Sequence, residues 1–188
     1  MMSWFHQERS PLLTNPSQPL AGFNILLTRP LEQTQEMAQQ LQALGATPFH
    51  FPTIEITPLS DYTKVDQALN NLGDFDWLIL TSVNGVKALQ ERSKALEFDM
   101  VSLLKKVKLA VMGSKTAQLL RECGIQPDIL PSHSVAESLM ETLLTQDIKG
   151  KKILALRADI ARTEPLEVLK AAGADVTNLA VYKTDSAP

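Results

Sequence analysis

Small polar residues follow three apolar segments of the chain, at points where a buried strand would turn into a helix. Hydroxyl and amide side chains there, with the free backbone N–H groups of a helix start, can bind carboxylates or phosphates. Helix capping needs the same residue types, so one such loop does not by itself indicate a ligand site. Three loops at one edge of a sheet make anion binding as good an explanation as capping. The residues are Thr81, Ser82 and Asn84, then Gly113, Ser114 and Thr116, and finally Ser132.

Arginine and tyrosine residues could take part in such a site. Arg157 stands at the end of an apolar run, where its guanidinium could meet an anionic ligand or form a surface ion pair, and Arg29 follows a similar run. Tyr182 could place its hydroxyl at the mouth of a cleft, or it could simply pack in the core.

Several other chemistries find no support. The segment 113–116 lacks the earlier glycine of a P-loop, which excludes nucleotide hydrolysis of that kind. The histidines are scattered without ligand spacing, so we expect no metal site. The net charge of -3 does not suggest nucleic-acid binding, and no apolar run approaches the ~20 residues of a membrane span. With a single cysteine and no signal peptide, we expect a cytoplasmic protein.

The elements that position these residues alternate along the chain. From residue 76 onward, five strand-like segments alternate with amphipathic helical segments, which predicts an α/β fold: a parallel sheet with helices on both faces. Residues 47–56 contain prolines and predict an edge strand or an extended connector. Ser134 and Glu137 have the spacing of a capping box. The expected strands are 25–28, 77–80, 108–112, 128–130, 153–156 and 176–182, and the expected helices are 32–44, 61–72, 84–96, 117–123, 135–144 and 162–172.

The chain contains one internal repeat. With a shift of 128 residues, segment 25–29 falls on segment 153–157, and 8 of 33 aligned positions are identical without a gap. We interpret this as a duplicated strand–helix–strand unit. The first copy, residues 25–56, lacks neighbouring strand–turn–helix segments of its own, and such a fragment cannot bury both faces of its strands alone. Residues 25–56 must therefore join the sheet predicted from residue 76 onward, or be completed by further segments or by another chain.

An ordered set of short motifs resembles a known family. The motifs are Leu27-Thr28-Arg29-Pro30, the segment 76–86 with Thr81-Ser82-Val83-Asn84-Gly85, the segment 111–117 with Gly113-Ser114-Lys115-Thr116, Cys123-Gly124-Ile125, and Ala180-Val181-Tyr182-Lys183-Thr184. In this order, and over residues 24–185, they resemble the uroporphyrinogen-III synthase family of tetrapyrrole biosynthesis.

The resemblance implies two flavodoxin-like α/β domains, joined by a two-stranded connector, with the active site between them. It implies a hydro-lyase that cyclises hydroxymethylbilane, a linear tetrapyrrole, with inversion of ring D, loss of water and no cofactor. Tyr182 matches a tyrosine considered for a catalytic role, and Thr81, Ser82 and Thr116 match polar cleft positions. The implied division is a disordered tail (1–23), part of the first domain (24–50), a connector strand (51–59), the complete second domain (60–179) and a return connector (180–188).

The family pattern also contains a second Thr-Ser strand end and a second Gly-x-x-Thr turn, which would complete the first domain. Neither follows the return connector in these 188 residues. We therefore expect a truncated member of the family, with a homodimer through the incomplete first domain as one way to cover it. The alternative is a non-catalytic α/β module that binds an anionic ligand or a partner protein.

Overall fold

The computed structural model describes residues 17–187, which fall into two units. Unit 1 extends to Glu55 and includes the chain from Ser186 onward, whereas unit 2 comprises Ile56–Asp185. The boundary falls within strand β3 (Ile54–Thr57) and at the end of strand β7 (Asp175–Ser186). Most of the expected N-terminal tail lies outside the described residues.

Unit 1 is a single strand–helix–strand unit. Strand β1 (Asn24–Leu27) pairs in parallel with β2 (Thr47–His50), and the helical segment between them consists of the 3-10 helix η1 (Leu31–Gln33) and α1 (Gln35–Ala43). The predicted helix over 32–44 is therefore confirmed. A left-handed residue, Gly45, with a φ of 91°, ends it, as glycine commonly does at this position.

Unit 2 confirms the predicted α/β class. Its sheet has the order β3-β7-β6-β4-β5, and the pairings β4–β5, β4–β6 and β6–β7 are all parallel. The remaining elements are α2 (Thr63–Asn70), the 3-10 helix η2 (Leu72–Asp74), β4 (Trp77–Leu80), α3 (Val83–Ala95), α4 (Met100–Leu104), β5 (Lys108–Val111), α5 (Ser114–Glu122), α6 (Ala136–Leu144), β6 (Lys152–Ala158) and α7 (Glu164–Ala171).

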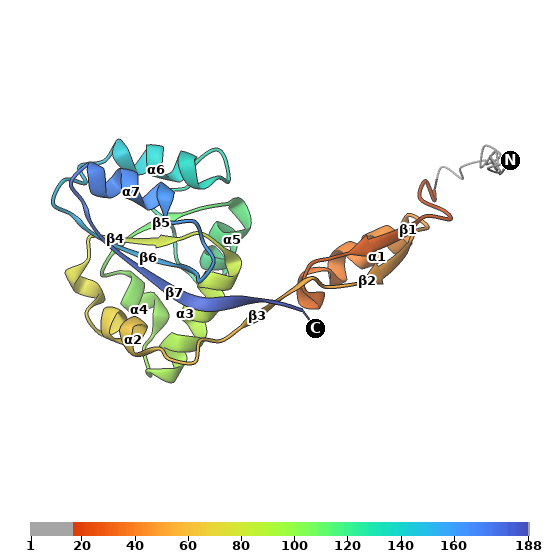
Figure 1. Ribbon diagram of the computed structural model, residues 1–188, viewed down its shortest axis with the longest axis horizontal. Helices are drawn as coiled ribbons and strands as arrows, with labels where there is room; N and C mark the ends of the chain where they lie inside the picture. Colours follow the sequence, from red (N-terminus) through yellow and green to blue (C-terminus); the bar gives the residue numbers. More distant parts are fainter. Residues whose placement is uncertain (1–16, 188) are drawn as a thin grey trace, which may run out of the picture. The chain divides into compact units, whose positions relative to one another are not determined.

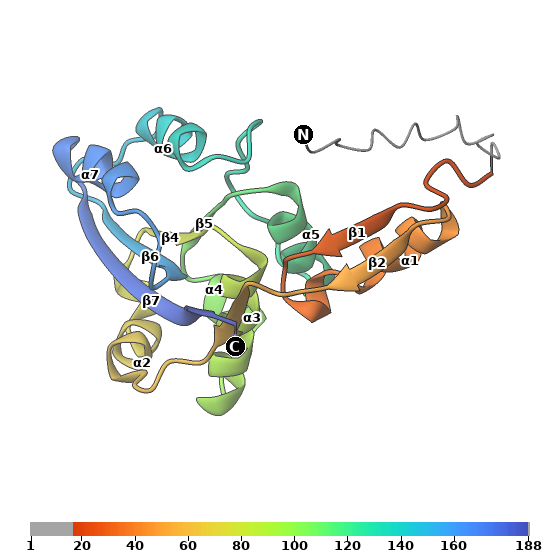
Figure 2. The same cartoon turned by 45° about the vertical axis from the view of Figure 1, so that its right-hand side comes forward.

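Strand β4 lies at the centre of two hydrophobic clusters, one on each face of the sheet. Leu78 and Leu80 pack with residues of α2 to α5, which we call the α3-side cluster. Trp77 and Ile79 pack with residues of α6 and α7, the α6-side cluster. Figures 1 and 2 both show α6 and α7 on one face of the sheet and α3 and α4 on the other. All four β4 residues are at most 3% exposed, as the apolar run 77–80 predicted for a strand covered on both faces.

Two local predictions were wrong. Residues 128–130 do not form a strand, because only Ile129 bridges to Ala110; the fifth strand of the sheet is β3 instead. Ser134 does not cap α6: the N-cap is Val135, with no side-chain cap hydrogen bond. The Glu137 carboxylate pairs with Arg162, 2.7 Å away, rather than closing a capping box.

The repeat is present in the backbone. Every residue pair of β1–β2 becomes a pair of β6–β7 when 128 is added to both numbers, so that Asn24↔Thr47 corresponds to Lys152↔Asp175. The two copies differ in burial, however. Leu26 in β1 is 58% exposed, whereas its counterpart Leu154 in β6 is fully buried.

Candidate functional site

The strand order creates a switch point between β4 and β6. From β4 the chain passes to β5 on one side, and it later returns to β6 on the other side of β4. In parallel α/β sheets, ligands bind beyond the carboxyl ends of the strands at such a point. A Cβ on Gly85, just after β4, would lie 3.6 Å from the carbonyl oxygen of Leu156 in β6. The first turn of α3 therefore lies directly beside the end of β6.

Ser82 and Tyr182 meet at this edge. The Ser82 Oγ accepts a hydrogen bond from the backbone N–H of Gly85 at 3.0 Å and so caps α3. The same Oγ is 3.0 Å from the hydroxyl oxygen of Tyr182, which is 8% exposed. Thr81 and Asn84 flank Ser82 and are half-buried. The pair joins β4, β7 and the N-terminus of α3 in one polar cluster.

The second and third predicted loops also lie together. Gly113 has a φ of 86°, and a Cβ there would lie 3.6 Å from the Oγ of Ser134. Ser114 begins α5 and is exposed, whereas Thr116 is only 4% exposed. Ser132, in the loop that carries Ser134, is exposed. The structure thus joins the loop after β5 to the loop before α6.

Within the described part of the chain, Arg157 does not form the surface ion pair that was one of its two sequence-based alternatives. It is 5% exposed, and its Nε donates to the Oδ1 of Asn178 at 3.1 Å while its Nη1 donates to the Arg162 carbonyl at 2.6 Å. Among the ion pairs of residues 17–187, none involves Arg157. Burial lowers the pKa of its guanidinium, since desolvation disfavours the charged form.

The predicted residues of unit 1 are placed differently. Thr28 and Arg29 are exposed, and the Thr28 carbonyl accepts hydrogen bonds from the N–H and hydroxyl of Thr53 at 3.0 and 3.2 Å. Their counterparts, Leu156 and Arg157, are buried. The buried setting of Arg157 therefore does not extend to Arg29.

Sequence analysis missed Asp159, Tyr62 and Asn178. Each is a lone polar residue without a motif, and each takes its place from contacts far along the chain. Asp159 reaches Tyr182 and Thr184, while Tyr62 reaches Val181. Of the three, only Asp159 could have been suspected from the sequence, because it lies two residues after the candidate residue Arg157.

Two cavities lie away from the switch point. One, of about 610 Å³, lies beside the amino ends of β4 and β5 and is lined by Lys105, Lys106 and Lys108 among others. The second, of about 320 Å³, lies between α6 and α7. Within residues 17–187, no group of three His, Cys, Asp or Glu side chains could hold a metal ion. Across the same residues, no helix has the length and apolar character that a membrane crossing needs.

Unit 2 belongs to the class of parallel α/β folds in which ligands bind beyond the carboxyl ends of the strands, and the Ser82–Tyr182 contact lies at that edge. Comparison with known families identifies which one: the family model described as uroporphyrinogen-III synthase HemD matches residues 35–188. The chain belongs to the uroporphyrinogen-III synthase family.

Individual relatives agree. The uroporphyrinogen-III synthase of Synechococcus elongatus is 38% identical over 168 residues, which are 89% of this chain and 62% of that protein. The enzyme of Escherichia coli is 29% identical over 161 residues, covering 85% of this chain and 64% of that one. A crystal structure of a mutant Thermus thermophilus uroporphyrinogen III synthase shares the fold, with a TM-score of 0.66 and 21% identity over 88% of this chain and 64% of its own. The chain thus spans less than two thirds of these relatives.

Proposed function

We propose that this chain contributes to uroporphyrinogen-III synthase activity: cyclisation of hydroxymethylbilane with inversion of ring D and loss of water, without a cofactor. The observation that carries the proposal is the Ser82–Tyr182 contact at the switch point of a chain that belongs to this family. In this proposal the carboxylates of the substrate meet hydroxyls and free N–H groups at the strand ends, since such donors bind anions without a dedicated cation.

The residues divide into two roles. The Tyr182 hydroxyl donates a hydrogen bond to the substrate hydroxyl that leaves as water, as a general acid would. The binding residues are those of the polar strand ends, together with the buried and positively charged Arg157. The proposed binding residues are Thr28, Arg29, Thr81, Ser82, Asn84, Gly113, Ser114, Thr116, Ser132 and Arg157.

A discontinuous assay tests the activity. Hydroxymethylbilane is incubated with the chain, and the oxidised products are separated into uroporphyrin isomers I and III. Isomer III in excess of the buffer blank supports the proposal, and sole formation of isomer I, the uncatalysed product, contradicts it for this chain. Tyr182→Phe should lower isomer III formation at least about 100-fold if the hydroxyl acts as general acid.

We also propose a division of the chain into domains, based on its membership of this family and on the strand order. The 2-1-3-4 order of the parallel strands, counted from β4, supports a flavodoxin-like second domain over 60–179. Residues 24–50 would then be part of a first domain, and residues 51–59 and 180–188 would be the two connectors. We propose the cytoplasm as the location of the protein.

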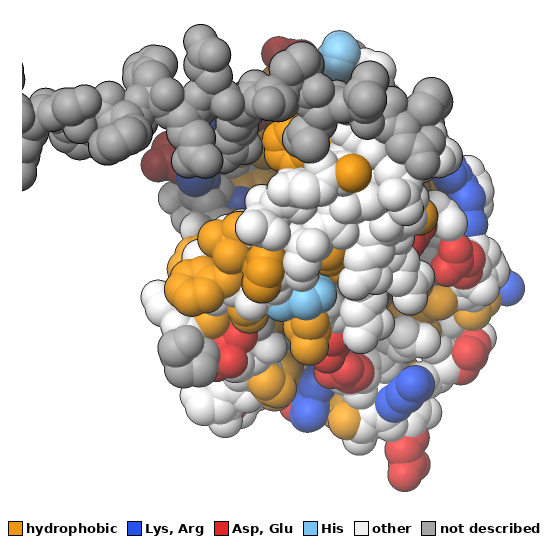
Figure 3. Space-filling view, turned by 90° about the vertical axis from the view of Figure 1, so that its right-hand side faces the viewer, with side chains coloured by type: hydrophobic (Ala, Val, Ile, Leu, Met, Phe, Trp, Pro, Cys, Tyr) orange, Lys and Arg blue, Asp and Glu red, His pale blue; other side chains and the backbone are white. Residues whose placement is uncertain are grey.

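We also propose that a second copy of the chain covers unit 1. Within the described residues β1 pairs with β2 alone, whereas its counterpart β6 pairs with both β4 and β7. Leu26 and Phe49 on this two-stranded sheet are 58% and 51% exposed, and Figure 3 shows one face on which hydrophobic side chains gather. Open strand edges with exposed apolar side chains favour association.

Sedimentation velocity tests this dimer. The parent chain should show a concentration-dependent dimer that Leu26→Lys abolishes. Ile160→Lys is the matched control, because Ile160 is also a large exposed apolar residue, at 67%, but lies in unit 2. A parent chain that stays monomeric at high concentration rules the dimer out.

A further inference from the structure

Strand β7 carries a β-bulge beside Tyr182. Up to Arg157↔Ala180 the pairing of β6 with β7 advances one residue at a time, but the next pair is Ala158↔Tyr182. Val181 is therefore an extra residue on β7. Bulges of this kind re-aim side chains and are common beside active sites.

The bulge determines which face of the sheet Tyr182 occupies. Side chains alternate along a regular strand, so Val181 and Tyr182 should face opposite ways. Instead both are buried in the α3-side cluster, at 1% and 8% exposure. In unbroken register Tyr182 would pair with residue 159 and face the α6-side cluster, away from Ser82 at the start of α3.

Asp159 holds the bulge from the side of β6. Its backbone N–H donates to the Tyr182 carbonyl at 3.1 Å, and its Oδ1 accepts the backbone N–H of Thr184 at 3.0 Å. The same Oδ1 accepts the N–H of Ile160 at 2.9 Å, which fixes the carboxylate itself. Asp159 therefore binds β7 on both sides of Lys183, immediately after the bulge.

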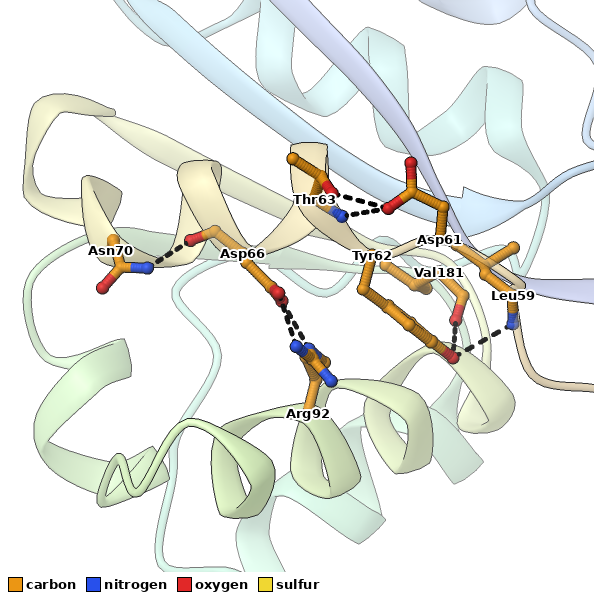
Figure 4. Close-up of polar contacts among 8 residues, drawn as sticks. All are labelled: Leu59, Asp61, Tyr62, Thr63, Asp66, Asn70, Arg92 and Val181. Atoms are coloured by element: carbon orange, nitrogen blue, oxygen red, sulfur yellow. Dashed lines mark hydrogen bonds and ion pairs between the residues drawn. The ribbon is translucent and has the colours of Figure 1, made fainter.

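Tyr62 holds the bulge from the side of α2, as Figure 4 shows. Its hydroxyl accepts the Leu59 N–H at 3.2 Å and donates to the carbonyl of the bulged Val181 at 3.5 Å, a long hydrogen bond. The Arg92 guanidinium lies 4.9 Å from the Tyr62 ring centroid and pairs with Asp66. The Tyr62 ring is thus fixed by its own neighbours.

We propose that Asp159 is a positioning residue, which stabilises the bulge at Val181 and so directs the Tyr182 hydroxyl to Ser82. The proposal rests on the proposed function of Tyr182. It is carried by the register shift, by the two consecutive side chains in one cluster, and by the contacts of Asp159 with Tyr182 and Thr184.

The experiment uses the tyrosine ring signals of the full chain. Tyr62 and Tyr182 are its only tyrosines, so tyrosine labelled only at the ring carbon that bears the hydroxyl gives two NMR signals, which Tyr62→Phe assigns. Ser82→Ala supplies the position of the Tyr182 signal without its hydroxyl partner. Asp159→Ala should move the Tyr182 signal toward that position. Asp159→Asn, which keeps a side-chain oxygen acceptor, should leave the Tyr182 signal at its position in the parent chain.

Matched controls separate positioning from general destabilisation. Glu164→Ala removes another exposed carboxylate, at the start of α7, and should leave both signals unchanged. An unmoved Tyr182 signal in Asp159→Ala overturns the proposal, as does a shift in Asp159→Asn as large as in Asp159→Ala.

Activity provides an independent readout. If the parent forms isomer III, Asp159→Ala should lower kcat about tenfold with little change in KM, because a misplaced general acid affects the chemical step more than binding. If the parent chain forms no isomer III but Asp159→Ala still shifts the Tyr182 signal, the result contradicts the proposed function and leaves the positioning role of Asp159 supported.

Discussion

Gly45 and Gly173 adopt the same backbone conformation 128 residues apart. Each has a φ of 91°, and each donates its N–H to the carbonyl three residues earlier at 2.9 Å. The next residue in each copy, Ala46 or Ala174, donates to the carbonyl five residues earlier, at 2.9 and 3.0 Å. Both helices therefore end in one type of cap, and this shared end sets the identical register of the strands that follow.

Replacing Gly45 should destabilise unit 1. A Cβ there would lie 3.0 Å from the Gln18 Cβ and 3.1 Å from the backbone of Ala21, in addition to a left-handed strain of about 1–2 kcal/mol. Gly45→Ala should therefore abolish hydrogen-exchange protection of the Thr47 amide, which donates to the Phe23 carbonyl at 2.8 Å. Gly22→Ala is the control, because its φ is 79° but nothing lies within 4 Å. Equal loss in both variants would show that backbone strain alone matters.

Ser82 and Tyr182 should be energetically coupled. Ser82→Ala removes both the α3 cap and the partner of Tyr182, and should lower the free energy of unfolding by about 1–2 kcal/mol. Tyr182→Phe should cost about 1 kcal/mol. The double variant should lose about 0.5–1.5 kcal/mol less than the sum of the two, as measured by urea unfolding.

A second capped helix provides the control for this cycle. Asp99 caps α4 by accepting the Ser102 N–H at 2.9 Å, and it has no contact with Tyr182. Asp99→Ala should therefore lower the free energy of unfolding by a similar amount. Its loss and that of Tyr182→Phe should be additive in the double variant. Additive losses for Ser82 and Tyr182 themselves would mean that their 3.0 Å contact contributes nothing.

Asp76 should make unit 2 sensitive to acid. Its Oδ2 accepts the Lys152 N–H at 2.9 Å and its Oδ1 lies 3.1 Å from the Lys151 Nζ. The hydrogen bond from Lys152 is the main reason that the pKa of this carboxyl falls below its ordinary value of 3.8. Because the folded pKa is lowered, the stabilisation is present above pH 3.8 and is lost as the pH falls through the folded pKa.

Asp76→Asn tests this contribution. The variant should be less stable near pH 7 by at most about 1 kcal/mol, since the group is partly solvated. The difference from the parent should shrink as the pH falls below 3.8, in urea unfolding at a series of pH values. A difference that stays constant down to pH 2 would exclude the ionised carboxylate as its source.

Arg157 should order the loop between β6 and α7. Its hydrogen bonds reach Asn178 in β7 and the carbonyl of Arg162 in that loop. Arg157→Met should expose the loop and accelerate tryptic cleavage after Arg162, while global stability changes little because the cost of burying the charge also disappears. Arg157→Lys should not restore protection, since an ammonium lacks the planar fork that spans both acceptors. Unchanged cleavage in Arg157→Met would contradict this role.

The sequence by itself determined the local elements and the family. Apolar runs such as 77–80 and helical periodicity predicted most strands and helices, because burial on one or two faces leaves a pattern within a few neighbouring residues. The internal repeat was visible for the same reason. The wrong predictions, the strand at 128–130 and the Ser134 cap, concern segments in which contacts from elsewhere outweigh local preference.

Only the tertiary structure decided how the candidate site is built. The Ser82–Tyr182 contact joins residues 100 positions apart, and the bulge that permits it is a property of how β6 and β7 pair. The burial of Arg157 likewise depends on Asn178 and Arg162. The register shift between β6 and β7, and with it the side of the sheet that Tyr182 faces, depends on contacts between segments that are distant in the sequence.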